Sequence, residues 1–188
     1  MFRVSVYLML IILCLSLKLA FATNTTEKVI LSNNLKTILD ARQFSLVGET
    51  TFSILFWDLY KSQLLTTSGK YPVEIEKENI LFDINYLVGI SSDDLIKNTI
   101  DQWQHLGIAH EIYEGYLPEL KAIWPNIKED DSLSLLIQQK RSVFYFNKQY
   151  IGVINDAEFG QLFLAIWLSE NTSEPSLRLE LLGSIKDE

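Results

Sequence analysis

The sequence predicts an α+β fold with antiparallel strands rather than a doubly wound parallel sheet. Segments in which apolar and polar side chains alternate, as they do in strands, gather in two groups, one early and one late in the chain. Segments with helical periodicity lie between these groups and after the second, instead of following each strand. Within the second group short turns separate the strands, and such turns join antiparallel neighbours.

The first group of strands follows a weakly patterned stretch, Val29–Asp40, in which we expect a short helix or an irregular lead-in. Two strands are then expected at Phe44–Gly48 and Thr51–Leu65, with a turn at Gly48–Glu49 between them. The second of these is apolar on both faces, which is typical of a strand inside a layered structure. A third strand is expected at Asn79–Ile90.

Two helices are expected between the strand groups. The first has a serine cap at Ser91 or Ser92, acidic residues in its first turn and an apolar stripe that ends near Leu106. The second covers about Glu111–Trp124 and ends before a proline, which disfavours helical geometry in the residue that precedes it.

The second strand group is followed by a helix that is apolar almost all round and must therefore be buried. Asn155 or Asp156 is expected to cap this helix, which ends at Leu168. Ser173 is expected to cap a last helix, which has a proline in its first turn and a glycine at its end. The strands of this group are expected at Ser132–Gln139, Ser142–Asn147 and Gln149–Ile154.

Residues 1–22 have the features of a signal peptide. A basic start precedes an apolar run, and the small residues Ala20 and Ala22 predict cleavage after Ala22. Lys18 interrupts the apolar run, which is shorter than the roughly 20 residues that a membrane-spanning helix needs. We therefore expect a periplasmic or secreted protein without a stable membrane anchor and with one domain over residues 23–188. An uncleaved anchor is the alternative.

The composition of the mature chain limits the classes of partner and of reaction that we expect for it. Removal of Arg3 and Lys18 takes the net charge from −8 to −10, which argues against nucleic acid and anionic membranes as partners. The lone cysteine is removed as well. His105 and His110 do not have the roughly three- or four-residue spacing of zinc ligands on one helix face. With no nucleophile or phosphate-binding motif either, we expect no metal, no cofactor and no nucleophilic catalysis.

Several short motifs, taken in their order and spacing, carry a family resemblance. They are Val47-Gly48-Glu49, Phe56-Trp57-Asp58-Leu59-Tyr60 with Leu64, Tyr86, Phe146-Asn147, Ile151-Gly152, Ile154-x-Asp156, Phe159, Phe163, Ile166-Trp167-Leu168-Ser169, Ser173-x-Pro175 and Leu177-Arg178. In these the chain resembles the bacterial secreted branch of the chalcone isomerase-like proteins. The resemblance implies an open-faced sandwich, with a large antiparallel sheet backed by a layer of helices and a ligand cleft between them.

The plant enzymes of that family close a chalcone into a flavanone, whereas other members resemble fatty-acid-binding proteins. This chain has other residues at the positions that carry out catalysis in the plant enzymes. The strand expected at Thr51–Leu65 has no arginine, and Leu55 and Ile166 stand where the family pattern has hydroxyl groups. The helix that begins near Ser92 supplies no tyrosine to polarise a ketone. Because aliphatic groups cannot stabilise developing charge, the resemblance implies a protein without flavanone-forming activity.

We therefore expect a non-catalytic protein that binds an apolar small molecule, such as a fatty acid, in the cleft between sheet and helices. Ligand pockets are lined mainly by aromatic and aliphatic side chains, although core packing is the alternative role for such residues. The candidate ligand-binding residues are Leu55, Trp57, Tyr60, Tyr86, Phe163, Ile166 and Trp167.

Two other functions stay open. An isomerase or lyase of unknown substrate would use other groups, such as Tyr60, Tyr86 or Tyr113, and one of them would point into the cleft beside a charged neighbour. An envelope protein-interaction module would instead dock its partner through an aromatic surface, and would expose an apolar patch of more than a few hundred Å².

Overall fold

The computed structural model describes residues 34–41, 44–73 and 77–184, and the chain divides into two units, residues 1–33 and 34–188. The expected signal peptide, its cleavage site and the first part of the lead-in lie outside the described residues. The end of that lead-in is a short helix, α2 (Leu35–Ala41). Among the described residues, no helix has both the length and the apolar character needed to cross a membrane.

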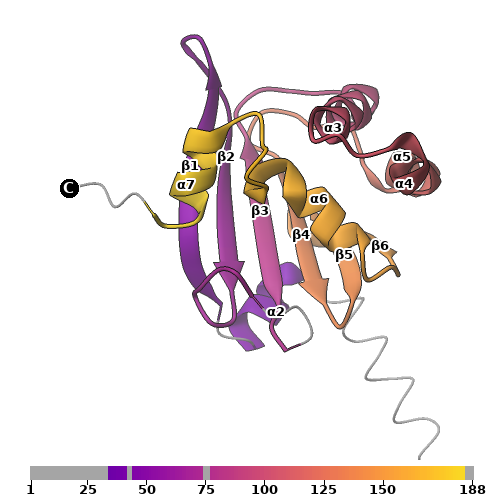
Figure 1. Cartoon of the computed structure of the whole chain (residues 1–188). Coiled ribbons are helices and arrows are strands. Elements are labelled where there is room, and N and C mark those ends of the chain that lie inside the picture. The colour runs from indigo at the N-terminus through magenta and orange to yellow at the C-terminus, as the bar shows by residue number, and fades with distance from the viewer. Residues whose placement is uncertain (1–33, 42–43, 74–76, 185–188) are drawn as a thin grey trace, which may run out of the picture. The chain divides into compact units, whose positions relative to one another are not determined.

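Six strands form one antiparallel sheet in which every strand pairs with the next one along the chain (Figure 1). Helices lie between β3 and β4 and after β6. This arrangement confirms the predicted α+β fold with antiparallel strands. The strands are β1 (Ser45–Ile54), β2 (Trp57–Thr66), β3 (Ile80–Tyr86), β4 (Ser132–Gln138), β5 (Arg141–Phe146) and β6 (Gln149–Ile154).

The first hairpin differs from the prediction, because the expected strand Thr51–Leu65 contains the turn. Ile54 at the end of β1 pairs with Trp57 at the start of β2, and Leu55 and Phe56 close the hairpin between them. Leu55 has a left-handed backbone conformation, with φ of 57°. A leucine is an unusual residue for that conformation, so the sequence offers no turn signal here.

The turn expected at Gly48–Glu49 is wrong as well, since β1 runs through both residues. Gly48 is needed for a close approach of backbones. A Cβ atom at this position would overlap the carbonyl oxygen of Glu180 in α7 (Pro175–Leu181). The missing side chain therefore allows α7 to lie directly on β1.

The helices between the strand groups begin as expected and then break up. Ser91 caps α3 (Ser92–His105), accepting a hydrogen bond from the backbone N–H of Asp94 at 3.1 Å. The single helix expected at Glu111–Trp124 is replaced by shorter pieces. One reason is Pro118 in the first turn of the last piece, since a proline inside a continuous helix would remove a hydrogen bond. The pieces are α4 (His110–Tyr113), a 3-10 turn (Glu114–Tyr116) and α5 (Leu117–Ile123).

Neither of the last two helices has the expected cap. α6 (Phe159–Leu168) follows Glu158, which makes no side-chain cap, and the Asp156 carboxylate accepts its hydrogen bond from the Glu158 N–H instead. Likewise α7 has no side-chain cap. The hydroxyl of Ser173 donates to the Gln102 side chain of α3 at 2.9 Å, and so ties α3 to the loop before α7.

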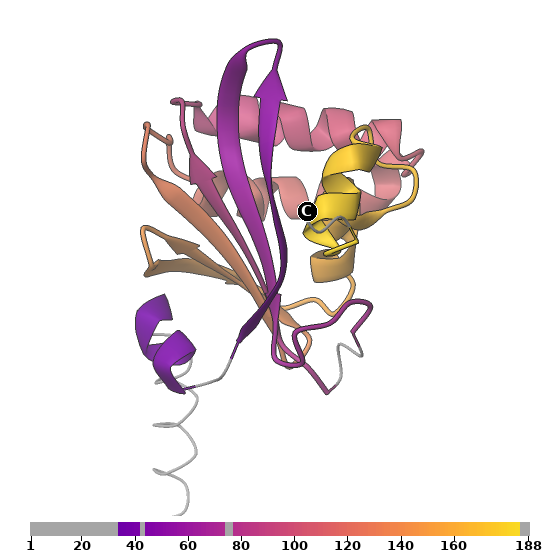
Figure 2. The ribbon, with the colours of Figure 1, turned by 90° about the vertical axis from the view of Figure 1, so that its left-hand side faces the viewer.

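The helices are layered on the sheet in a way that leaves one region open. Figure 2 shows α6 and α7 on one side of the sheet and α2 on the other. α7 packs on β1 and β2, α6 packs on β5, and α5 packs on β6. α3 packs mainly on α5 and α6. α3 is therefore held mainly by its neighbouring helices. It packs less closely on the sheet than α6 and α7 do.

Candidate ligand-binding site

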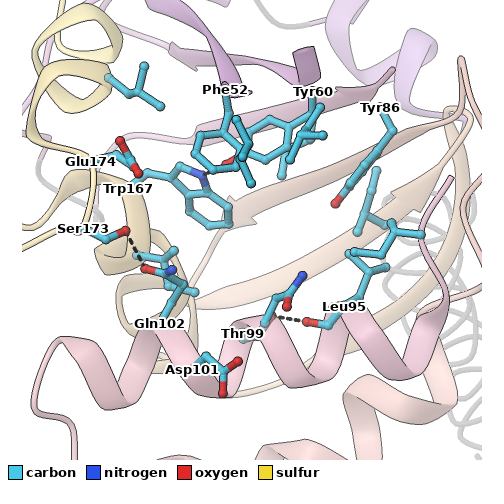
Figure 3. Close-up of a pocket in the computed structure, with 18 of the residues that line it drawn as sticks. Phe52, Tyr60, Tyr86, Leu95, Thr99, Asp101, Gln102, Trp167, Ser173 and Glu174 are labelled. Atoms are coloured by element: carbon cyan, nitrogen blue, oxygen red, sulfur yellow. Dashed lines mark hydrogen bonds between the residues drawn. The ribbon is translucent and has the colours of Figure 1, made fainter. Parts of the chain in front are cut away.

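A cavity of about 420 Å³ lies beneath α3, between this helix and the sheet. Figure 3 shows its walls, with aromatic rings from the sheet on one side and the face of α3 on the other. Most of the lining side chains are aromatic or aliphatic. From the sheet they include Phe52, Tyr60, Ile84, Tyr86 and Leu133, from α3 Leu95 and Thr99, and from α6 Phe163, Ile166 and Trp167.

The aromatic wall follows from the register of the first three strands. Phe52 of β1 lies directly opposite Tyr60 of β2, which lies directly opposite Tyr86 of β3. Residues directly opposite in adjacent strands project from the same face of a sheet. The rings are accordingly close, with centroids 5.2 Å apart for the first pair and 6.0 Å apart for the second. Three rings in a row therefore face the helices.

Trp167 of α6 joins this wall to the helix layer. Its indole N–H donates a hydrogen bond to the Tyr60 hydroxyl at 3.0 Å. Its ring also packs on Phe82 and Phe163, with centroid distances of 4.6 Å and 5.2 Å. These contacts fix the indole in one position, so this side of the cavity is preformed.

Most hydroxyl groups along the helix side already have partners. The Thr99 hydroxyl donates to the carbonyl of Leu95 at 2.8 Å, and the Thr172 hydroxyl donates to the carbonyl of Ile166 at 2.6 Å. Such bonds satisfy the hydroxyl within its own segment. These threonines therefore add little free hydrogen-bonding capacity to the cavity.

Two lining residues do have donors without partners. Within the described part of the chain, the Tyr86 hydroxyl makes no hydrogen bond, and the indole N–H of Trp124 is buried without an acceptor. Figure 3 shows the Tyr86 hydroxyl pointing into the space between sheet and α3. Buried donors are normally paired, so an unpaired donor at a cavity is a natural contact for a ligand oxygen.

The two tyrosines that line the cavity keep their protons at neutral pH. The pKa of the Tyr60 phenol is raised to about 12, mainly by burial, while the hydrogen bond from Trp167 lowers it and the nearby Glu174 carboxylate makes a smaller raising contribution. Burial also raises the pKa of the Tyr86 phenol. Both are therefore neutral hydroxyl groups, and neither is poised to act as a base.

Polar residues line the cavity at the C-terminal part of α3. Gln102 and Ser173 are joined there, and Glu174 and Asp101 also belong to the lining, the Asp101 carboxylate lying on the side of α3 that faces away from the rings (Figure 3). Lys97 lies 2.8 Å from Asp101 on the outer surface of α3 but does not line the cavity. Of the described residues that do line it, none is a lysine, arginine or histidine.

Five of the seven residues expected at the ligand site come together here, namely Tyr60, Tyr86, Phe163, Ile166 and Trp167. Leu55 and Trp57 do not line the cavity. Their side chains are 87% and 72% exposed, because the chain turns at Leu55 and carries both residues to the hairpin tip.

Tyr113, a candidate for catalysis, lies elsewhere in the fold. It is buried in α4 with its ring stacked on Trp103 at 5.1 Å, and it does not line the cavity. An isomerase or lyase at this site is therefore left with Tyr60 and Tyr86. Only Tyr60 has a charged neighbour, Glu174, and an anion opposes ionisation of the phenol instead of promoting it.

The sequence interpretation missed the contribution of α3. The apolar stripe of this helix gave a signal, because Leu95 belongs to it, although that stripe equally predicts core packing. Gln102 and Glu174 carry no comparable signal. They come together only through the packing of α3 against the loop before α7.

Comparison with known proteins identifies the family and agrees with the fold. The family model described as chalcone isomerase-like matches residues 23–183. An uncharacterized protein of Haemophilus influenzae is 23% identical over 140 residues, which cover 74% of this chain and 68% of that protein. A solved structure of a fatty-acid binding protein of Arabidopsis thaliana superposes with a TM-score of 0.53 at 9% identity. That match covers 75% of this chain and 85% of the plant protein, and at this identity it shows a shared fold alone.

Proposed function

Because this chain belongs to the chalcone isomerase-like family, we propose that it is an exported, non-catalytic protein that holds an acyl-chain lipid, such as a fatty acid, between its sheet and its helices. The observation that carries the proposal is the apolar cavity beneath α3. Its volume of about 420 Å³ lies within the roughly 300–1,000 Å³ of small-molecule sites. The name of the Arabidopsis neighbour supports the same class of ligand.

The walls of the cavity suit a long apolar chain. Ile84, Leu95 and Ile166 supply aliphatic surface, and the aromatic row on the sheet supplies a flat wall. Each methylene group transferred from water to such a surface contributes about 0.8 kcal/mol. The proposed binding residues are the five expected residues that line the cavity, together with Leu95 and Ile84.

Catalysis is less well supported by the same geometry. Ring closure or elimination needs a group that takes a proton or stabilises an anion in the transition state. The described lining has no cationic side chain to stabilise an anion, and burial holds the Tyr60 and Tyr86 phenols in their protonated form. The two carboxylates of the lining, Asp101 and Glu174, are exposed, and that of Asp101 is paired with Lys97. We therefore assign the site to binding.

The direct test of binding uses delipidated protein and a panel of fatty acids, alcohols and esters of different chain length, read by native mass spectrometry. We expect one ligand per chain to be retained, with a preference for one range of lengths. If no fatty acid or related single-chain lipid is retained, the cavity does not serve lipid binding.

Export is tested separately. The proposed signal peptide predicts that the protein recovered from the periplasm or the medium begins at Thr23. Recovery of the unprocessed chain in the membrane fraction would favour an anchor instead.

A second candidate function is docking of another envelope protein through the tip of the β1–β2 hairpin. The tip extends beyond the neighbouring strands (Figure 1), and its residues Ile54, Leu55, Phe56 and Trp57 are 52%, 87%, 96% and 72% exposed. Grouped exposed apolar residues of this kind are typical of interaction sites.

Cross-linking and pull-down from envelope extracts would test this candidate. Replacement of Leu55, Phe56 and Trp57 by serine should abolish a specific partner band, whereas Ile112→Ser, at an exposed apolar position on α4, should leave it in place. A band that survives the triple replacement would exclude the tip as the docking site.

A further inference from the structure

The charges around the cavity all have one sign. The described lining contains two charged side chains, and both are carboxylates, Asp101 and Glu174. Lys97 pairs with Asp101 on the outer surface, but Glu174 has no ion pair among the described residues. Glu174 is an exposed residue of the lining, and its charge reaches Tyr60, where it makes a small contribution to the raised pKa of the phenol. An anionic head would meet repulsion here and no cation.

A carboxylate placed in such an apolar space would lose its hydration without gaining a partner of opposite charge. Removing a charge from water without compensation opposes binding by several kcal/mol. Buried carboxylates are therefore normally held by an arginine, a lysine or several N–H donors. The described lining offers only neutral donors, among them the Tyr86 hydroxyl and the Trp124 indole N–H.

Neutral donors fit a neutral acceptor. A hydroxyl or ester oxygen needs one or two hydrogen bonds when it is buried, and no countercharge. The unpaired donors of Tyr86 and Trp124 could supply such bonds without loss of an existing bond. The same arrangement would leave a carboxylate with its full charge uncompensated.

From these observations we infer that the natural ligand is a single-chain lipid with an uncharged polar head, such as a long-chain alcohol or ester, and that Glu174 helps to exclude fatty-acid anions. This inference rests on the proposed lipid-binding function and narrows it. It assigns the polar residues beside the cavity a role in selecting the head of the ligand.

The test compares dodecan-1-ol with dodecanoate, which share a chain length and differ in head charge. Affinities of the delipidated protein are measured at pH 8 and low salt by calorimetry or by tryptophan fluorescence. We expect the alcohol to bind at least about tenfold more tightly than the anion, a difference of about 1.4 kcal/mol. Equal or tighter binding of dodecanoate would overturn the inference while leaving lipid binding intact. Binding of neither compound would overturn lipid binding and the inference with it.

The role of Glu174 is tested with Glu174→Gln, which removes the charge and keeps the shape. We expect dodecanoate to bind about two- to fivefold more tightly to this variant, the size usual for exposed charge interactions, with no change for the alcohol. Glu111→Gln on α4 makes the same change of net charge away from the lining, and should alter neither affinity. An alcohol-to-anion ratio that is the same in Glu174→Gln as in the parent would overturn the role of Glu174. Unchanged melting temperatures confirm that both variants are folded.

Discussion

The two halves of the sheet are packed in different ways. Against β4 and β5 the helices form a closed aromatic cluster, in which Phe144, Phe159 and Phe163 contact one another and Trp124 contacts Phe144 and Phe163, with ring centroids 5.6–6.1 Å apart. Against β2 and β3 the rings of Tyr60 and Tyr86 face a cavity. The helices thus pack closely on the half of the sheet formed by β4 and β5, here called the closed half, and leave a cavity over the half formed by β2 and β3, here called the open half.

This difference separates most of the residues that hold the fold together from those available for binding, and Phe163 and Trp124 lie at the border, since they belong to the cluster and also line the cavity. The closed half has fully buried hydrocarbon side chains, whereas the open half carries the unpaired Tyr86 hydroxyl and the polar residues near Glu174. Substitutions in the closed half should therefore change stability, and substitutions in the open half should change binding. Each prediction below tests that division.

The largest effect is expected for Phe144→Ala in the closed half. Phe144 is 0% exposed and sits among other rings, so its removal leaves a cavity and should lower the free energy of unfolding by about 3–5 kcal/mol. Phe52→Ala in the open half removes a ring of the same size from a partly exposed position and should destabilise the protein less. Urea denaturation measures both, and equal losses would show that the two halves are packed alike.

The next effect is expected on binding alone, for Asn98→Trp. Asn98 is an exposed residue of α3 that lines the cavity, so an indole at this position can block the cavity without disturbing the core. We expect the affinity for dodecan-1-ol to fall at least about tenfold, or 1.4 kcal/mol. Stability should change by no more than about 0.5 kcal/mol. Gln104→Trp adds the same ring at an exposed position of α3 outside the lining, and should bind as the parent does.

The closed half was the more predictable half from sequence. The apolar strand patterns of β4 and β5 and the apolar character of α6 predict buried elements directly, and the structure confirms them. The order of the strands and helices along the chain was sufficient to predict the α+β fold. The prediction succeeds here because β4 and β5 are buried on both faces, and a short, largely apolar run between turns is the pattern of such a strand.

The open half contains most of the errors, for physical reasons that no short motif carries. Gly48 looks like a turn residue but makes room for α7, and Leu55 looks like a strand residue but closes the hairpin. Leu55 and Trp57 were consequently expected at the ligand site and lie at the exposed tip. The polar residues Gln102 and Glu174 were missed, because their meeting depends on how α3 docks against a distant loop.

A smaller effect is expected for Tyr86→Phe, which removes the unpaired hydroxyl and keeps the ring. If this hydroxyl donates to the head of the ligand, the affinity for dodecan-1-ol should fall about two- to tenfold, the usual size of one hydrogen bond. The affinity for dodecane, which has no oxygen, should not change. Tyr150→Phe on β6, outside the cavity lining, serves as the control. A parallel loss for alcohol and alkane would mean that the hydroxyl shapes the cavity without contacting the head.

The smallest effect is expected for ionisation of the Tyr60 phenol, which changes the stability of the protein at alkaline pH and not at neutral pH. Burial raises its pKa in the folded protein to about 12, from an ordinary value of 10.0. In the unfolded chain the phenol loses its proton near the ordinary value, so between pH 10 and 12 the unfolded state binds fewer protons than the folded state. The free energy of unfolding therefore falls as the pH rises through this window, and the contribution is fully present below pH 10.

Tyr60→Phe isolates this contribution, because the lysines that also titrate in the window are unchanged. We expect the parent protein to lose stability more steeply than the variant between pH 10 and 12, measured by urea denaturation at each pH. Tyr86, whose pKa is raised by burial as well, contributes in the same direction in both proteins. Parallel pH profiles would indicate that the Tyr60 phenol is already hydrated in the free protein, and that the open half of the fold is filled with water before a ligand binds.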